Sequence, residues 1–224
     1  GKKYPVMLWF YGGGNRTGYG SQGIFDGEAL ARHGIVFVTF NYRLGALGFL
    51  AHPELSAESG VGASGNQSLL DDIAVLRWIQ RNIREFGGDS GCVTIFGESA
   101  GAAHVNCLMA SPLAKGLFHR AIAQSSARFR GVNGGMATRA QAETAGQKYA
   151  EGQKAPSLAS LRNAPADELV RPMGFDFIND GHALRADLDT TFESGQQQDV
   201  PLLLGSNADR SEEHTSELQS RGLI

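Results

Sequence analysis

The feature that most constrains this fold is a Gly-x-Ser-x-Gly turn between a predicted strand and a predicted helix. The apolar pair Ile95-Phe96 leads into Gly97-Glu98-Ser99-Ala100-Gly101, and small, helix-compatible residues follow. A serine on so sharp a turn has a strained backbone, and glycines two residues to either side let neighbouring backbone pass. The pentapeptide alone also occurs by chance in a glycine-rich chain. Its context, a buried strand over 92–96 and a helix over 102–109, favours a nucleophile elbow with Ser99 as the nucleophile.

Two further apolar runs predict buried strands near the start of the chain. Val6-Met7-Leu8-Trp9-Phe10 is a continuous apolar run typical of a central parallel strand, and a second run covers 35–40. Residues 24–34 between them predict a short helix closed by Gly34. A strand, a helical crossover and a second strand imply a right-handed βαβ unit and therefore a parallel sheet.

Three consecutive glycines, Gly12-Gly13-Gly14, follow the first apolar run. Their peptide N–H groups can point at one spot, and such a loop near a nucleophile elbow supplies an oxyanion hole. The alternative is a flexible or phosphate-cradling loop. No Lys-Ser or Lys-Thr pair follows, as a P-loop requires, so the oxyanion hole is favoured.

Residues 66–86 predict an amphipathic helix, since apolar residues recur every three or four positions. The apolar face comprises Leu69, Leu70, Ile73, Leu76, Ile79, Ile83 and Phe86. The arginines on the other side, Arg77, Arg81 and Arg84, are interpreted as a solvated face. A strand is expected over 118–125, and residues 200–207 are expected to return to the sheet as a buried strand.

The predicted domain organisation is a core over 1–126, a helical lid or insertion over 127–198 and a return strand over 199–209. Within the insertion, short polar helices are expected around 136–152, 157–163 and 165–171, without a comparable strand. Phe175 and Phe177 are candidates to line an apolar acyl or alcohol pocket there. Packing of these rings against the core is the alternative.

Composition excludes several classes of function. The chain has 224 residues, 42% of them hydrophobic, and a net charge of −3, so no basic field indicates a nucleic-acid partner. No apolar run approaches the roughly 20 residues that a spanning helix needs. Cys92 and Cys107 are interpreted as buried small hydrophobes, not as a redox pair. No His/Cys/Asp cluster has metal-ligand spacing, so we expect neither metal nor cofactor; localisation and oligomeric state stay open.

Several motifs in order resemble the type-B carboxylesterase branch of the α/β-hydrolase fold, which includes bacterial para-nitrobenzyl-type esterases and the cholinesterases. The resemblance covers residues 4–209 and rests on the strand and glycines over 9–14, on Asn41-Tyr42-Arg43-Leu44-Gly45-Ala46-Leu47-Gly48-Phe49, on Gly65-Asn66, Leu69-Leu70-Asp71 and Phe86-Gly87-Gly88-Asp89, and on the elbow over 93–102. It implies a mostly parallel sheet with helices on both faces. It also implies hydrolysis of small carboxylic esters by a Ser-His-Glu triad.

The same resemblance assigns roles to individual residues. The peptide N–H groups of Gly13, Gly14 and Ala100 would form the oxyanion hole. Glu98 would stand in the substrate gorge beside the nucleophile, and Arg43 would pair with Asp71 as structural support. Asn15 departs from the pattern, because the family often has an aromatic residue after the glycines.

The remaining triad members are not evident in the chain. The order in this fold is nucleophile, acid, histidine, and His33 and His52 precede Ser99. We interpret His104 and His119 as structural histidines, which leaves His182 as the only conceivable base. The acid is expected as the glutamate of an Asn-x-Asp-Glu-Gly sequence, but in 207–210 an arginine stands where that glutamate is expected.

Residues 210–224 explain this break. The run Arg210-Ser211-Glu212-Glu213-His214-Thr215-Ser216-Glu217-Leu218-Gln219-Ser220 is what a common sequencing-library adapter encodes in one reading frame, so we expect it to be a translation artefact and His214 to have no catalytic role. The chain is then expected to be the central fragment of a serine carboxylesterase, truncated at both ends and inactive alone. The alternative is a non-catalytic adhesion or binding member of the same fold. Retention of Ser99 with its glycine neighbours argues against that alternative.

Overall fold

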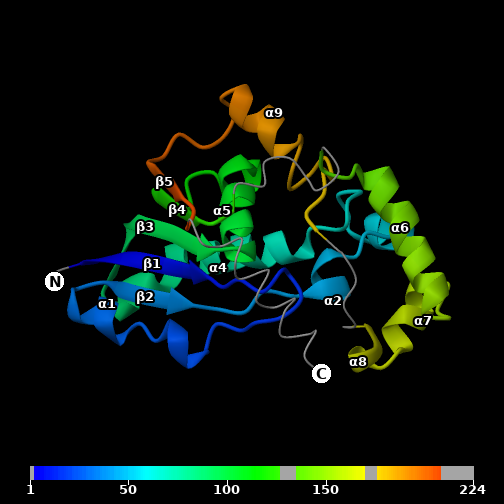
Figure 1. Cartoon of the computed structure of the whole chain (residues 1–224), viewed down its shortest axis with the longest axis horizontal. Coiled ribbons are helices and arrows are strands. Elements are labelled where there is room, and N and C mark those ends of the chain that lie inside the picture. The colour runs from blue at the N-terminus through cyan, green and yellow to red at the C-terminus, as the bar shows by residue number, and fades with distance from the viewer. Residues whose placement is uncertain (1–2, 127–134, 170–175, 208–224) are drawn as a thin grey trace.

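A parallel sheet of five strands organises the part of the chain that the computed structural model describes, residues 3–126, 135–169 and 176–207 (Figure 1). The strands are β1 (Tyr4–Phe10), β2 (Val36–Thr39), β3 (Gly88–Glu98), β4 (Arg120–Gln124) and β5 (Leu202–Gly205). Their spatial order is β2-β1-β3-β4-β5, and every adjacent pair is parallel. β2 lies on one side of β1, and β3, β4 and β5 follow on the other side. The topological switch point therefore lies between β1 and β3. In open parallel sheets, ligands bind at the carboxyl ends of the strands at such a switch point.

Helices connect the strands and cover the sheet. They are α1 (Glu28–Arg32), α2 (Gly45–Phe49), α3 (Pro53–Glu58), α4 (Gln67–Asn82), α5 (Ala100–Ala110), α6 (Arg139–Gly152), α7 (Leu158–Asn163), α8 (Ala166–Leu169) and α9 (Leu188–Glu193), with 3₁₀ turns η1 (Gly23–Phe25), η2 (Ile83–Phe86) and η3 (Pro112–Ala114). None of the helices in the described ranges is long and apolar enough to traverse a bilayer. The elbow helix α5 starts two residues before its predicted start, and α2, α3 and α9 were not predicted.

Side chains of β1 alternate between two apolar layers, as a strand covered on both faces requires. Val6, Leu8 and Phe10 join the main core with the buried faces of α4 and α5. Trp9 points to the opposite layer, where its ring lies 5.2 Å from that of Phe25 and 4.8 Å from that of Phe96. The predicted parallel sheet with helices on both faces is confirmed.

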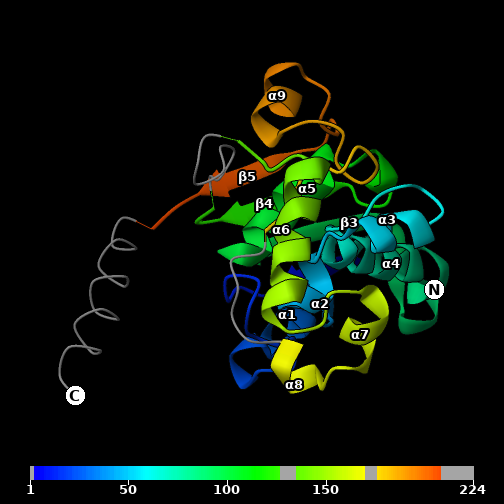
Figure 2. The same cartoon turned by 90° about the vertical axis from the view of Figure 1, so that its right-hand side faces the viewer.

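Helices α6, α7 and α8 lie at the end of the molecule toward which β1 and β2 run (Figure 1) and stand in front of the sheet when viewed from that end (Figure 2). Capping boxes at Thr138 and Ser157 start α6 and α7, since each hydroxyl accepts an N–H of the first turn. These helices share a small separate core with α2. It comprises Ala46, Leu50, Tyr149, Ala150, Ala155 and Leu161.

Several sequence predictions about burial are wrong. Leu70, predicted on the apolar face of its helix, is 40% exposed. Cys92 and the strand β2, both predicted to be buried, are only half-buried. The run in β5 is exposed, with Leu203 65% accessible, because β5 pairs only with β4 and is the edge strand of the described sheet. Phe86 is 63% exposed because α4 ends at Asn82 and the tighter η2 turn changes the winding before Phe86. Its ring instead lies 5.7 Å from that of Trp78 on the outer surface.

Candidate active site

Ser99 lies where β3 ends and α5 begins, at the carboxyl edge of the sheet. Its φ of 57° and ψ of −121° are outside the regions favoured by residues with a side chain. Its N–H donates to the carbonyl of Gln124 at 3.0 Å, and its carbonyl accepts the N–H of Ala103 at 3.1 Å. The half-buried serine makes no side-chain capping bond to α5. Its backbone is therefore fixed while its hydroxyl is not used to start the helix.

The glycines on either side of Ser99 are required by close backbone passage. A Cβ on Gly101 would lie 2.0 Å from the carbonyl oxygen of Phe10 at the end of β1. A Cβ on Gly97 would lie 2.5 Å from the carbonyl of Gly101. Real Cβ atoms essentially never approach other atoms within 3.0 Å, so only glycine lets β1, β3 and α5 meet at this point.

The glycine loop Gly12–Gly14 follows β1 and lies beside Ser99. A Cβ on Gly12 would be 3.1 Å from the Cβ of Ser99. Gly13 has a φ of 121°, and its carbonyl accepts the N–H groups of Arg16 and Thr17, which closes a tight turn. Gly14 has a φ of 63° and open space where a Cβ would stand. The loop therefore bends next to the serine and leaves room at Gly14.

Ala100, the third predicted oxyanion donor, is the first residue of α5 and directly follows Ser99. Amides of the first helical turn have no carbonyl partner within the helix, and the helix start carries partial positive charge. The amides of Gly13, Gly14 and Ala100 thus come from two segments that converge at Ser99.

Glu98 is the last residue of β3 and is half-buried. Its Oε2 lies 3.0 Å from the position that a Cβ on Gly12 would take. The carboxylate therefore lies against the glycine loop, in the residue that directly precedes Ser99.

The two phenylalanines predicted as pocket residues have different outcomes. Phe177 is only 6% exposed and belongs to the main core, where its ring packs against Phe49 at 5.1 Å and His104 at 4.7 Å. Phe177 therefore packs against the core, which is the alternative that the sequence left open for this ring. Phe175 lies outside the described residues.

Arg43 and Asp71 form the predicted ion pair. The guanidinium donates from Nε to Oδ2 and from Nη2 to Oδ1, both at 2.8 Å. These hydrogen bonds raise the pKa of Arg43, while its partial burial opposes the shift. The pair ties the segment after β2 to α4. From the same segment, Gly45 donates its N–H to the carbonyl of Asn15 at 2.8 Å, just after the glycine loop.

No histidine in the described ranges forms a hydrogen bond with the hydroxyl of Ser99. The described histidines are His33, His52, His104, His119 and His182. His104 is fully buried and bonded to other side chains, and the Nδ1 of His119 accepts the N–H of Val93 at 3.2 Å. Both are structural, as predicted. Arg210 and His214 lie outside the described residues.

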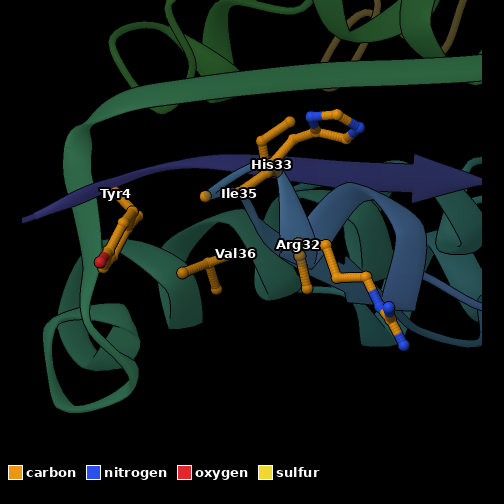
Figure 3. Close-up of a pocket in the computed structure, with 7 residues that line it drawn as sticks. Tyr4, Arg32, His33, Ile35 and Val36 are labelled. Carbon is orange, nitrogen blue, oxygen red and sulfur yellow. The ribbon is translucent and has the colours of Figure 1, made fainter.

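A hollow of about 410 Å³ lies at the amino end of the sheet (Figure 3), whereas Ser99 follows the carboxyl end of β3. The hollow is lined by Tyr4, Ala31, Arg32, His33, Gly34, Ile35 and Val36, at the amino ends of β1 and β2. None of the predicted site residues borders it. Within the described ranges, no group of three or more His, Cys, Asp or Glu side chains could hold a metal ion.

Comparisons with known proteins agree on one family. The model of the "Carboxylesterase family" matches residues 1–220. The fumonisin B1 esterase of Sphingopyxis macrogoltabida is 44% identical over 98% of this chain and 42% of its own length. The para-nitrobenzyl esterase of Bacillus subtilis is 35% identical over 93% of this chain and 44% of its own length. The solved structure of the Geobacillus stearothermophilus carboxylesterase EST55 superposes with a TM-score of 0.86 at 35% identity, covering 98% of this chain and 47% of that one. The chain thus spans less than half the length of these relatives.

Proposed function

Since this chain belongs to the carboxylesterase family, we propose that Ser99 is the nucleophile with which the protein hydrolyses small carboxylic esters. The observation that carries the proposal is the position of Ser99, strained at the elbow with the glycine loop against it. A Cβ on Gly12 would be 3.1 Å from the Cβ of the serine. Strained backbone persists only where the surroundings impose it, and it clusters at functional sites.

The reaction is acyl transfer in two steps. The Ser99 oxygen attacks the ester carbonyl, and the amides of Gly13, Gly14 and Ala100 donate to the negative oxygen of the tetrahedral intermediate. Collapse of the intermediate expels the alcohol and leaves an acyl-serine, which water then hydrolyses to the acid. Backbone donors suit this role because they are rigid before substrate arrives. Removing one such donor typically costs about 10²- to 10³-fold in rate.

A serine hydroxyl needs a base to take its proton, and the described histidines do not reach it. We therefore propose that the 224-residue chain supplies the nucleophile and oxyanion amides but does not turn over ester by itself. The names of the fumonisin B1 and para-nitrobenzyl relatives support carboxylic esters as the substrate class. Segment 127–198, with Phe175, is proposed to wall the acyl or alcohol pocket, because α6–α8 lie toward the carboxyl end of the sheet (Figure 1).

The test places this chain in an otherwise complete relative. Residues 4–207 replace the matching segment of the Bacillus subtilis para-nitrobenzyl esterase, and hydrolysis of p-nitrophenyl acetate is followed. We expect the chimera to turn over ester, and Ser99→Ala to lower kcat by about 10⁶-fold, the order found for a serine nucleophile. The 224-residue chain should show no hydrolysis that depends on Ser99.

Ser111→Ala is the matched control, because it removes a serine hydroxyl that accepts the N–H of Leu113 at the start of η3, outside the segment proposed to wall the pocket. It should cost about 1 kcal/mol of stability without lowering kcat. Activity that survives Ser99→Ala would refute the assignment of the nucleophile. A folded chimera without any activity would favour the non-catalytic binding member of the fold.

A further inference from the structure

A buried polar array adjoins the site and has no role in the acyl-transfer steps. His104 lies on α5, and its Nδ1 is 2.5 Å from Oδ2 of Asp72 on α4. Nε2 of the same ring is 3.2 Å from Oδ1 of Asn15, which directly follows the glycine loop. The His104 and Asp72 side chains are 0% exposed, and Asn15 is 6% exposed. Three polar side chains from distant segments therefore meet inside the core.

Aromatic rings enclose the imidazole of His104. The rings of Tyr42 and Phe177 lie 4.1 Å and 4.7 Å from it, and those of Phe10 and Phe49 lie at 6.2 Å. A net charge is costly in such surroundings, because neither water nor a mobile ion reaches it. The Asp72–His104 pair is therefore most stable with no net charge.

This condition places a proton on Nε2 of His104. The pair is neutral when one proton is shared between Oδ2 of Asp72 and Nδ1 and a second is on Nε2, which then donates to Oδ1 of Asn15. Burial raises the pKa of Asp72, although His104 opposes the shift. In the alternative arrangement, the Asn15 side chain is rotated so that its NH₂ group donates to an unprotonated Nε2 of His104. This arrangement would leave a buried negative charge without compensation, and the neighbouring Asp71 carboxylate raises the pKa of Asp72 further.

The array connects the nucleophile to the glycine loop through one rigid element. Ser99 is the N-cap of α5, and His104 extends from the same helix. Asn15 has a φ of 60°, and its carbonyl accepts the N–H of Gly45 at 2.8 Å, so it is held on both its side chain and its backbone. Because α5 fixes both Ser99 and Asn15, it also limits the distance between the serine and the amides of Gly13 and Gly14, which directly precede Asn15.

We propose that His104, oriented by Asp72, is a positioning residue that holds Asn15 and thereby sets the amides of Gly13 and Gly14 relative to Ser99. The catalytic meaning of this positioning rests on the proposed function, because it matters for rate only if those amides stabilise an oxyanion. The positioning itself is a property of the chain and is measurable without substrate.

The test uses nitrogen-15 NMR of the 224-residue chain and its Asn15→Gly variant. Glycine tolerates the positive φ of this position but removes the acceptor for Nε2–H. In the unsubstituted chain we expect Nε2 of His104 to carry a proton that is protected from exchange with solvent. The backbone amides of Gly13 and Gly14 should have order parameters of about 0.85, as in rigid backbone. In Asn15→Gly the Nε2 proton should lose its protection, and the glycine order parameters should fall below about 0.6.

The matched control is Gln80→Leu. Gln80 is a partly buried amide whose Nε2 donates to the carbonyls of Ser90 and Leu117 at the far end of the sheet. Its loss should destabilise the chain and leave the order parameters of Gly13 and Gly14 unchanged.

A second comparison tests His104 in an Asp72→Asn background, where no buried carboxylate is left unpaired. His104→Gln retains a side-chain N–H for Asn15, whereas His104→Leu does not. We expect glutamine to restore the rigidity of the loop amides more fully than leucine. Equal order parameters in these two variants would overturn the role of His104.

The outcomes separate this proposal from the proposed function. If Asn15→Gly leaves the glycine order parameters unchanged, the turn at Gly13 suffices to fix the loop and the positioning proposal is wrong, even if the esterase test succeeds. If the loop loses order in Asn15→Gly and glutamine at position 104 restores it more fully than leucine, but the chimera has no Ser99-dependent activity, the positioning holds and the proposed function is wrong.

Discussion

Ser99→Gly should make the chain more stable than Ser99→Ala, although both remove the hydroxyl. The φ of 57° and ψ of −121° at this position cost a residue with a Cβ about 1–3 kcal/mol. Glycine avoids this strain but loses about 0.5–1 kcal/mol more backbone entropy on folding. The difference leaves about 1 kcal/mol in favour of glycine. For a chain of this length, that raises Tm by about 2–4 °C.

The assay is thermal unfolding followed by circular dichroism, with urea unfolding at 25 °C as a second measurement. Ser99→Ala should unfold close to the unsubstituted chain, because the hydroxyl makes no capping bond. Lys154 is the control position, since it is exposed and has a φ of 57°. There too, glycine should be more stable than alanine. If Ser99→Gly is no more stable than Ser99→Ala while the Lys154 pair behaves as expected, the elbow is not strained and the argument from its backbone fails.

Two further predictions concern the core and the sheet edge. Burial raises the pKa of Tyr11 to about 12, above the value near 10 of an unfolded tyrosine, and burial likewise raises that of Tyr42. The free energy of unfolding should therefore fall as pH rises above about 10. The fall should be less steep in Tyr11→Phe, and urea unfolding at several alkaline pH values measures the difference. Leu203→Lys on exposed β5 should change stability by less than about 0.5 kcal/mol, whereas Leu108→Ala in the core should cost about 2–5 kcal/mol. Equal losses in urea unfolding would contradict the edge position of β5.

Local sequence patterns predicted the fold because its main elements carry strong local signals. The run over 6–10 is apolar on both faces, and the elbow needs its glycines for reasons that hold within a few residues. The sequence could not predict that Leu202–Leu204 is exposed. Apolar character sets a preference for burial, but the neighbouring strands and helices decide whether a given run is covered.

The site was predictable where its parts are adjacent in sequence and less so where they are distant. Ser99, Glu98 and Ala100 follow from one motif. The contact of Asn15 with His104 joins residues 89 positions apart, and that of His104 with Asp72 joins residues 32 apart. One signal was present in the sequence: Asp72 stands between Leu69 and Ile73 on the apolar face of the predicted helix. A carboxyl at such a position needs a buried partner.

The separate core of α6–α8 bears on how such a protein can diversify. Its side chains pack with one another and with α2, while the elbow belongs to the layers around β1, β3 and α5. The connection between that core and the elbow runs through α2, whose first residue Gly45 donates its N–H to the carbonyl of Asn15. Substitutions among α6–α8 that leave α2 in place therefore transmit little strain to the serine. Under the proposed function, selection for other esters would change these helices around the site while Ser99 and the glycine loop stay as they are.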